Sequence, residues 1–183
     1  MVGQLRRTAF PPTPRRVVSD VRGGALDVQL NLADLFELNT HAFGIKGEVY
    51  AGQGLGNVAG GIVQTLDAVT WRPIHTKGGW IEGFVYLTPN LHIHTGVTID
   101  DPDDKDITAI PNSLWGRTYN KTIWGNLIWD INKSFRVAFE VTRRETAYKE
   151  PTNLTNKGWG FHTQLQWTFD SGYLRGTREP QLF

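Results

Sequence analysis

The residues of this chain that could do chemistry are imidazole and charged side chains separated by even numbers of positions. His92 and His94 form a His-x-His pair, and Arg136, Glu140 and Arg144 recur four apart. Even spacing places side chains on one face of a β-strand. Two imidazoles on one face could begin a metal site, but no third ligand stands nearby in the sequence. We therefore interpret them as polar residues of one sheet face.

A dense acidic run extends from Asp100 to Asp106. Carboxylate oxygens are the ligands that Ca²⁺ prefers, but the run lacks the glycine and the terminal glutamate of an EF-hand loop. We expect a solvated loop, in which Asp101, Asp103 and Asp104 are the residues that a calcium ion would use. No metal and no other cofactor is predicted.

Catalytic signals are missing from the sequence. No serine stands in a nucleophile-elbow context, and the acidic residues alternate with basic ones instead of converging as an acid/base pair. The segment from Gly52 to Ala59 contains the spacing G-x-G-x-x-A, but no βαβ unit follows to hold a dinucleotide. We interpret it as a mobile Gly-rich loop, which in a barrel could also fold back into the lumen and narrow it, and we predict no enzyme.

Composition narrows the class of protein further. Lys+Arg number 19 against 18 for Asp+Glu, so no strong field exists to attract nucleic acid. Cysteine is absent, which removes disulfides and thiolate metal sites. No run of about 18 apolar residues occurs, so any membrane crossing would have to be made by strands. Seven Trp and 20 Gly suit a barrel with an apolar outside and a polar inside.

Alternation of apolar and polar residues recurs along the chain and predicts strands of roughly ten residues. About seven such segments are found, at 25–35, 42–52, 78–87, 91–99, 119–129, 134–148 and 158–169. Short connections (36–39, 88–90, 132–133) alternate with long ones (52–77, 100–117, 146–157). This rhythm is typical of a barrel with tight turns on one rim and large loops on the other. The pattern predicts an all-β fold of antiparallel transmembrane β-barrel strands, as part of a larger barrel.

Each strand then has a lipid face and a polar face. We expect these apolar residues to face lipid: Leu26, Leu30, Ile45, Val49, Val137, Phe139, Val141, Phe161 and Leu165. We expect these polar residues to line the interior: Lys46, Glu48, His92, His94, Arg136, Glu140, Arg144, His162 and Gln164. We place these aromatic residues near the rims: Trp80, Tyr86, Tyr119, Trp129, Tyr148, Trp159 and Trp167. Amphipathic rings favour the headgroup region there.

An alternative fits the same alternation. A soluble, Trp-rich β-sandwich could bind carbohydrate on an aromatic platform, helped by Ca²⁺ at the acidic run. Its strands would need neither uniform length nor the rhythm of short and long connections. Aromatic residues near strand ends favour the barrel, since a sandwich would bury them centrally.

The run from Phe43 to Phe169 resembles the C-terminal half of single-chain bacterial outer-membrane porins. FGIKGEVYAGQGLG, GGWIEGFVYLTPNL, TIWGNLIWDINKSFRVAFEVTRRETAY and the closing GFHTQLQWTF carry the resemblance. It implies a passive channel for small polar solutes or ions in the bacterial outer membrane, in contact with lipid, with a homo-oligomer as one possible assembly. In that family a final aromatic residue, here Phe169, is recognised by the barrel-assembly machinery.

The resemblance also divides the chain. Residues 24–169 would form the barrel strands, 1–23 a poorly ordered or truncated Pro/Arg-rich segment, and 170–183 a polar tail beyond the assembly signal. Porins have more strands than seven, which implies a missing N-terminal half. Pro11, Pro12 and Pro14 stand where the apolar core of an export signal would be, so we expect no such signal in this chain.

Overall fold

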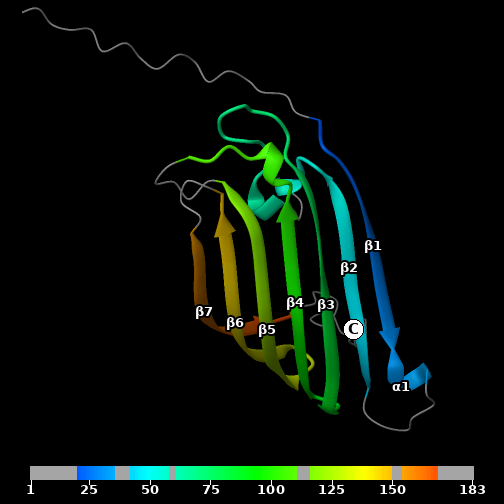
Figure 1. Cartoon of the computed structure of the whole chain (residues 1–183). Helices are drawn as coiled ribbons and strands as arrows, with labels where there is room; N and C mark the ends of the chain where they lie inside the picture. The colour runs from blue at the N-terminus through cyan, green and yellow to red at the C-terminus, as the bar shows by residue number, and fades with distance from the viewer. Residues whose placement is uncertain (1–19, 36–41, 58–60, 111–115, 150–153, 169–183) are drawn as a thin grey trace, which may run out of the picture.

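A computed structural model describes residues 20–35, 42–57, 61–110, 116–149 and 154–168. Its strands form one seven-stranded antiparallel sheet in the order β1-β2-β3-β4-β5-β6-β7 (Figure 1). The strands are β1 (Arg22–Asn31), β2 (Phe43–Gln53), β3 (His75–Thr88), β4 (Leu91–Pro102), β5 (Arg117–Asn132), β6 (Phe135–Tyr148) and β7 (Thr155–Trp167). The expected all-β, antiparallel architecture is confirmed. Each strand pairs with its neighbours in the sequence, as in a meander.

Two of the three short connections that the sequence predicts are confirmed. The third is wrong, because β1 ends at Asn31 and residues 32–42, not the turn predicted at 36–39, join it to β2. Residues 89–90 join β3 to β4, and residues 133–134 join β5 to β6. Asn132 closes the second turn, because its Oδ1 accepts hydrogen bonds from the amides of Ser134 and Phe135 at 2.9 and 3.0 Å. A single helical turn, α1 (Leu32–Leu35), follows β1. The tight turns lie at one end of the sheet and the long loops at the other (Figure 1).

β3, β4 and β5 are longer than the alternation indicates. β5 has 16 residues and β3 has 14, because pairing continues into polar residues beyond the apolar segment. A tilted strand of about 9–11 residues suffices to cross a bilayer. The strands therefore extend past that length toward the long loops.

β1 and β7 are the two edges of the sheet. Every residue of β1 except Asn31 is exposed, and so is every residue of β7 except Gly160. Within the described strands the sheet is thus open. The only helices among the described residues are single turns, none of which could cross a membrane.

The long loops pack together over one end of the sheet. The loop between β2 and β3 contains η1 (Leu55–Asn57) and η2 (Gly61–Val63), and the loop after β4 contains η3 (Asp104–Asp106). Ile74 and Ile107 are 2 % and 3 % exposed there. Three of the five buried apolar side chains of the described residues, Leu55, Ile74 and Ile107, belong to this loop cluster.

Asp67 joins the two loops. Its carboxylate accepts hydrogen bonds from the amide and hydroxyl of Thr108, at 2.7 and 2.9 Å, and from those of Thr70, both at 2.8 Å. Burial opposes its charge, but these hydrogen bonds outweigh burial and hold the pKa of Asp67 at about 2. Nearby, Gln64 accepts from the amides of Gly116 and Arg117 and donates to the Arg117 carbonyl. These contacts fix the loop cluster on the sheet.

Candidate functional site: two faces of one sheet

Strand register divides the side chains into a polar face and an apolar face. Paired residues of an antiparallel sheet point to the same side, and Lys46 pairs with Glu82, which pairs with Gly96. Following these rows across the sheet places all nine predicted interior residues on the polar face: Lys46, Glu48, His92, His94, Arg136, Glu140, Arg144, His162 and Gln164.

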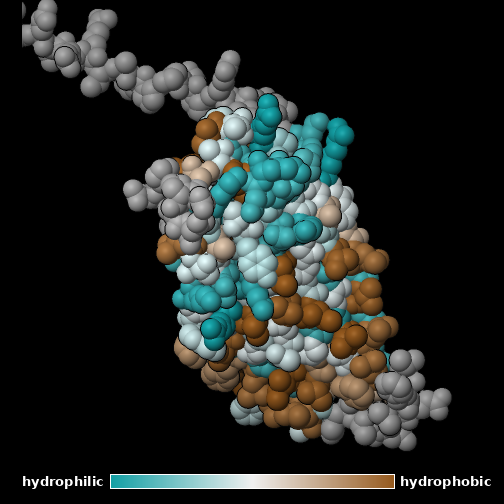
Figure 2. All heavy atoms as spheres, in the orientation of Figure 1, coloured by the Kyte–Doolittle hydropathy of each residue, from teal (hydrophilic) through white to brown (hydrophobic). Residues whose placement is uncertain are grey.

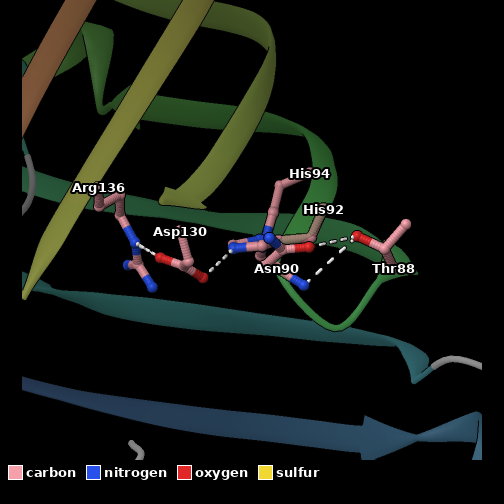
Figure 3. A network of polar contacts seen from close by, with 6 residues as sticks. All are labelled: Thr88, Asn90, His92, His94, Asp130 and Arg136. Atoms are coloured by element: carbon pink, nitrogen blue, oxygen red, sulfur yellow. Dashed lines mark hydrogen bonds and ion pairs between the residues drawn. The ribbon is translucent and has the colours of Figure 1, made fainter. Parts of the chain in front are cut away.

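A chain of six side chains crosses the polar face from β2 to β6, which we call the six-residue chain: Lys46, Glu82, His94, His92, Asp130 and Arg136. Glu82 Oε1 lies 2.9 Å from Lys46 Nζ and 2.5 Å from His94 Nδ1. His94 Nε2 lies 2.7 Å from His92 Nδ1, and His92 Nε2 lies 3.1 Å from Asp130 Oδ2. Arg136 Nε donates to Asp130 Oδ1 at 2.5 Å. Figure 3 shows the end of this chain from His94 to Arg136.

The centre of the six-residue chain is buried against aromatic rings. His92 is 2 % exposed and Glu82 is 7 % exposed. Tyr86 stacks on His92 with ring centroids 4.4 Å apart, and Phe84 stacks on His94 at 5.8 Å. The turn beside it is fixed as well, since the Asn90 carbonyl accepts a hydrogen bond from the Asp130 amide. The two imidazoles are therefore held in place from several sides.

The β2–β3 loop lies over the polar face at the long-loop end. The amide of Ile62 donates to Asp100 Oδ2 at 2.5 Å, and Thr76 Oγ1 donates to Asp100 Oδ1 at 2.9 Å. Asp100 belongs to the polar face, as its pairing with Asn120 shows. Leu55 packs over Gly52, where a Cβ atom would come within 2.9 Å of its side chain. The described parts of the Gly-rich segment therefore do fold back over the sheet.

The opposite face is apolar, and its side chains are exposed. All nine residues expected to face lipid lie on it. Its large exposed residues are Leu26, Val28, Leu30, Ile45, Val49, Ile81, Val85, Leu87, Ile93, Ile99, Ile123, Leu127, Trp129, Ile131, Phe139, Val141, Trp159, Phe161, Leu165 and Trp167. Phe161 alone is 77 % exposed. Single exposed apolar residues are ordinary, but a contiguous face of them marks an interaction surface.

A row of charges on the same face marks where the apolar region ends. Lys77 on β3 lies opposite Asp101 on β4. Two residues closer to the tight turns, Ile99 of β4 lies opposite Lys121, which continues the row through Glu145 on β6 to Lys157 on β7. Lys77 pairs with Asp101 and Lys157 with Glu145, both at 3.4 Å. In the described strands β3 to β7, Arg143 is the one charged residue on this face between that row and the tight turns, and its guanidinium lies 5.4 Å from the Trp159 ring centroid. Figure 2 shows the same division, with hydrophilic residues toward the long loops and hydrophobic ones toward the tight turns.

The apolar region has the same length on β3, β5 and β7, whereas on β6 it ends at Val141, before Arg143. It runs from Gly79 to Leu87 on β3, from Ile123 to Ile131 on β5 and from Trp159 to Trp167 on β7. Nine residues span about 26 Å along a strand at the usual rise. This length falls in the range of about 9–11 residues that a tilted strand needs to cross a bilayer. The hydroxyl of Thr95, which lies within the apolar region, donates a hydrogen bond to the Trp124 carbonyl.

The expected aromatic belt is only partly placed as predicted. Tyr119, Trp129, Trp159 and Trp167 follow the apolar face. Trp80 and Tyr86 instead lie on the polar face, opposite Thr98 and His92, and Tyr148 follows Thr146 onto it. Trp80 is also in mid-strand, because β3 begins five residues before it. Distance from a strand end does not determine the face on which a residue lies, because successive side chains of a strand point to opposite faces.

The acidic run does not gather into one site. Asp101 pairs with Lys77, Asp103 with Lys105, and Asp106 with His75. Asp104 is exposed, and its carbonyl accepts from Lys149 Nζ. The described residues contain no group of three or more acidic, histidine or cysteine side chains that could hold a metal. Phe169, the expected assembly signal, lies outside the described residues.

Glu82 and Asp130 are the residues of the polar face that the sequence analysis missed. They lie 12 positions before His94 and 38 positions after His92. Alignment of each strand with its neighbour would have shown that both residues share a sheet face with the two histidines. Comparison with protein-family models, with curated proteins and with solved structures finds no match to this chain.

Proposed function

We propose that this sheet forms part of the wall of a transmembrane β-barrel channel in a bacterial outer membrane, through which small polar solutes or ions diffuse. The observation that carries the proposal is the exposed apolar face, nine residues high and bounded by a row of charges. In water such a face would be a large unpartnered patch. In a bilayer it matches the hydrocarbon region and its charged boundary.

The polar face then lines a water-filled lumen. It carries both signs of charge, among them Lys46, Glu82, Asp130, Arg136 and Glu140. Mixed charge along a pore favours hydrated solutes and sets ion selectivity at the narrowest point. The β2–β3 loop, held at Asp100, narrows the lumen on the long-loop side. No reactive group is required for such a function.

A closed barrel requires more strands, and strand direction restricts their number. β1 and β7 run in the same direction, because six antiparallel steps separate them. An antiparallel closure therefore needs an odd number of added strands, the first and last of them running opposite to β1 and β7. A second copy inserted in the same orientation would place its β1 parallel to β7. We propose that a different polypeptide segment completes the barrel.

Membrane association tests the proposal without requiring a closed pore. The full chain is refolded in the presence of lipid vesicles, which are then floated through a density gradient and washed with alkaline carbonate. We expect the chain to float and to resist the wash, because its apolar face is covered by acyl chains. A chain that stays in the aqueous fraction without detergent, as a carbohydrate-binding module would, contradicts the proposal.

A further inference from the structure

The two imidazoles of the six-residue chain are joined by more hydrogen bonds than two neutral rings can supply. Three contacts run in sequence, from Glu82 to His94, from His94 to His92 and from His92 to Asp130, at 2.5, 2.7 and 3.1 Å. Each contact needs one proton. Two neutral imidazoles carry two N–H protons in total. If both donate outward to the carboxylates, the facing nitrogens are both acceptors and cannot bond to each other.

A third proton resolves the conflict. It resides either on a carboxyl group or on an imidazole, and the flanking cations decide between them. Lys46 lies 2.9 Å from Glu82, and Arg136 contacts Asp130 at 2.5 Å. A cation at that distance favours the ionised carboxylate. Burial of His92, at 2 % exposure, opposes a charged ring, so the proton is held on the imidazoles by the two ionised carboxylates that contact them, Glu82 and Asp130. The Tyr86 and Phe84 ring faces against the imidazoles stabilise positive charge as well.

We propose that His92 and His94 form a proton-binding site that holds one additional proton between the two rings, as an imidazole–imidazolium pair. The charged and titratable groups facing it are Lys46 from β2, Glu82 and Tyr86 from β3, Asp130 from β5, and Arg136 from β6. Glu140 of β6 faces it through Asn126, whose amide donates to Glu140 at 3.5 Å. No oxidant, metal or other ligand takes part.

Release of this additional proton has a structural consequence. Two nitrogen lone pairs would then face each other at 2.7 Å, so one ring turns away and the six-residue chain breaks at its centre. Its net charge also falls from +1 to zero, because two carboxylates balance only two of three cations. On the proposed lumen wall, on which this consequence rests, rising pH would weaken the attraction for anions.

Histidine nitrogen NMR on the full chain in detergent micelles tests the proton site directly. In the wild type we expect His92 and His94 to titrate as one coupled pair. The signal of the N–H···N hydrogen bond between the two rings should vanish when the additional proton leaves. His94→Gln supplies an amide donor to His92 Nδ1, so His92 satisfies both nitrogens while neutral. Its midpoint should fall, because no neighbouring ring then shares the proton. The matched control, His162→Gln, alters the same face on exposed β7 and should leave the pair unchanged.

A second variant keeps the test decisive if His94→Gln does not fold. Asp130→Asn retains an acceptor for His92 Nε2 but removes the negative charge that stabilises the additional proton. The histidine pair should therefore lose this proton at a lower pH than in the wild type. Independent titration of the two histidines, or identical midpoints in all variants, overturns the proposal. Since the NMR readout needs no pore, failure of membrane association overturns the channel and leaves the proton site standing.

Discussion

Asp67 shows how one residue orders the long loops, and its effect depends on pH. Its pKa in the fold, about 2, lies below the ordinary 3.8. Its stabilisation is therefore complete above about pH 4 and is lost as the pH falls toward 2. The shift corresponds to about 2 kcal/mol. The protection of the Thr70 and Thr108 amides from hydrogen exchange, relative to the intrinsic rate at each pH, should fall through this range.

Replacing the carboxylate gives the same result at neutral pH. We expect Asp67→Asn to remove about 1–3 kcal/mol of local stability, because a neutral amide accepts more weakly and brings an unmatched donor. Exchange at Thr70 and Thr108 measures the loss. Asp104→Asn is the matched control, since that side chain is exposed in the neighbouring loop. Unchanged exchange in Asp67→Asn would mean that other contacts hold the loops together.

At the scale of the element, β7 offers neighbouring residues on opposite faces. Phe161 lies on the apolar face at 77 % exposure, and His162 lies on the polar face. If lipid covers the apolar face, Phe161→Arg should lower the free energy of unfolding from vesicles by about 2–4 kcal/mol. His162→Arg should change it by less than about 1 kcal/mol. In water neither variant should matter, so equal and small effects would argue against lipid contact.

The elements could be predicted from local pattern, whereas the six-residue chain could not. Alternation around Leu26, Val137 or Phe161 indicates both a strand and its face, because a period of two is a local property. The contacts of Glu82 and Asp130 with the histidines depend on register between strands, which the tight turns set. The buried Asp67 has no local signature either, since its partner Thr108 lies 41 residues away.

At the scale of the whole molecule, the charges of the polar face should set ion selectivity. Arg136 is neutralised in part by Asp130, but Arg144 is exposed opposite Thr122 and Gly158. In the assembled pore, Arg144→Gln should move the reversal potential under a salt gradient toward cations. The shift should shrink as salt rises, because the Debye length is about 8 Å at physiological ionic strength. Arg143→Gln on the apolar face is the control, and an equal shift there would place Arg144 outside the conduction path.

The central claim is that one face of this sheet contacts lipid and the other contacts water, and residues 159–166 of β7 test it most directly. The chain contains no cysteine, so a single cysteine carrying a nitroxide label can be introduced at each position in turn. Paramagnetic accessibility is then measured in vesicles with oxygen, which concentrates in lipid, and with a polar nickel complex, which stays in water. We predict that odd positions respond to oxygen and even positions to nickel, alternating without a break. Equal access of nickel to both sets would contradict the membrane-spanning sheet.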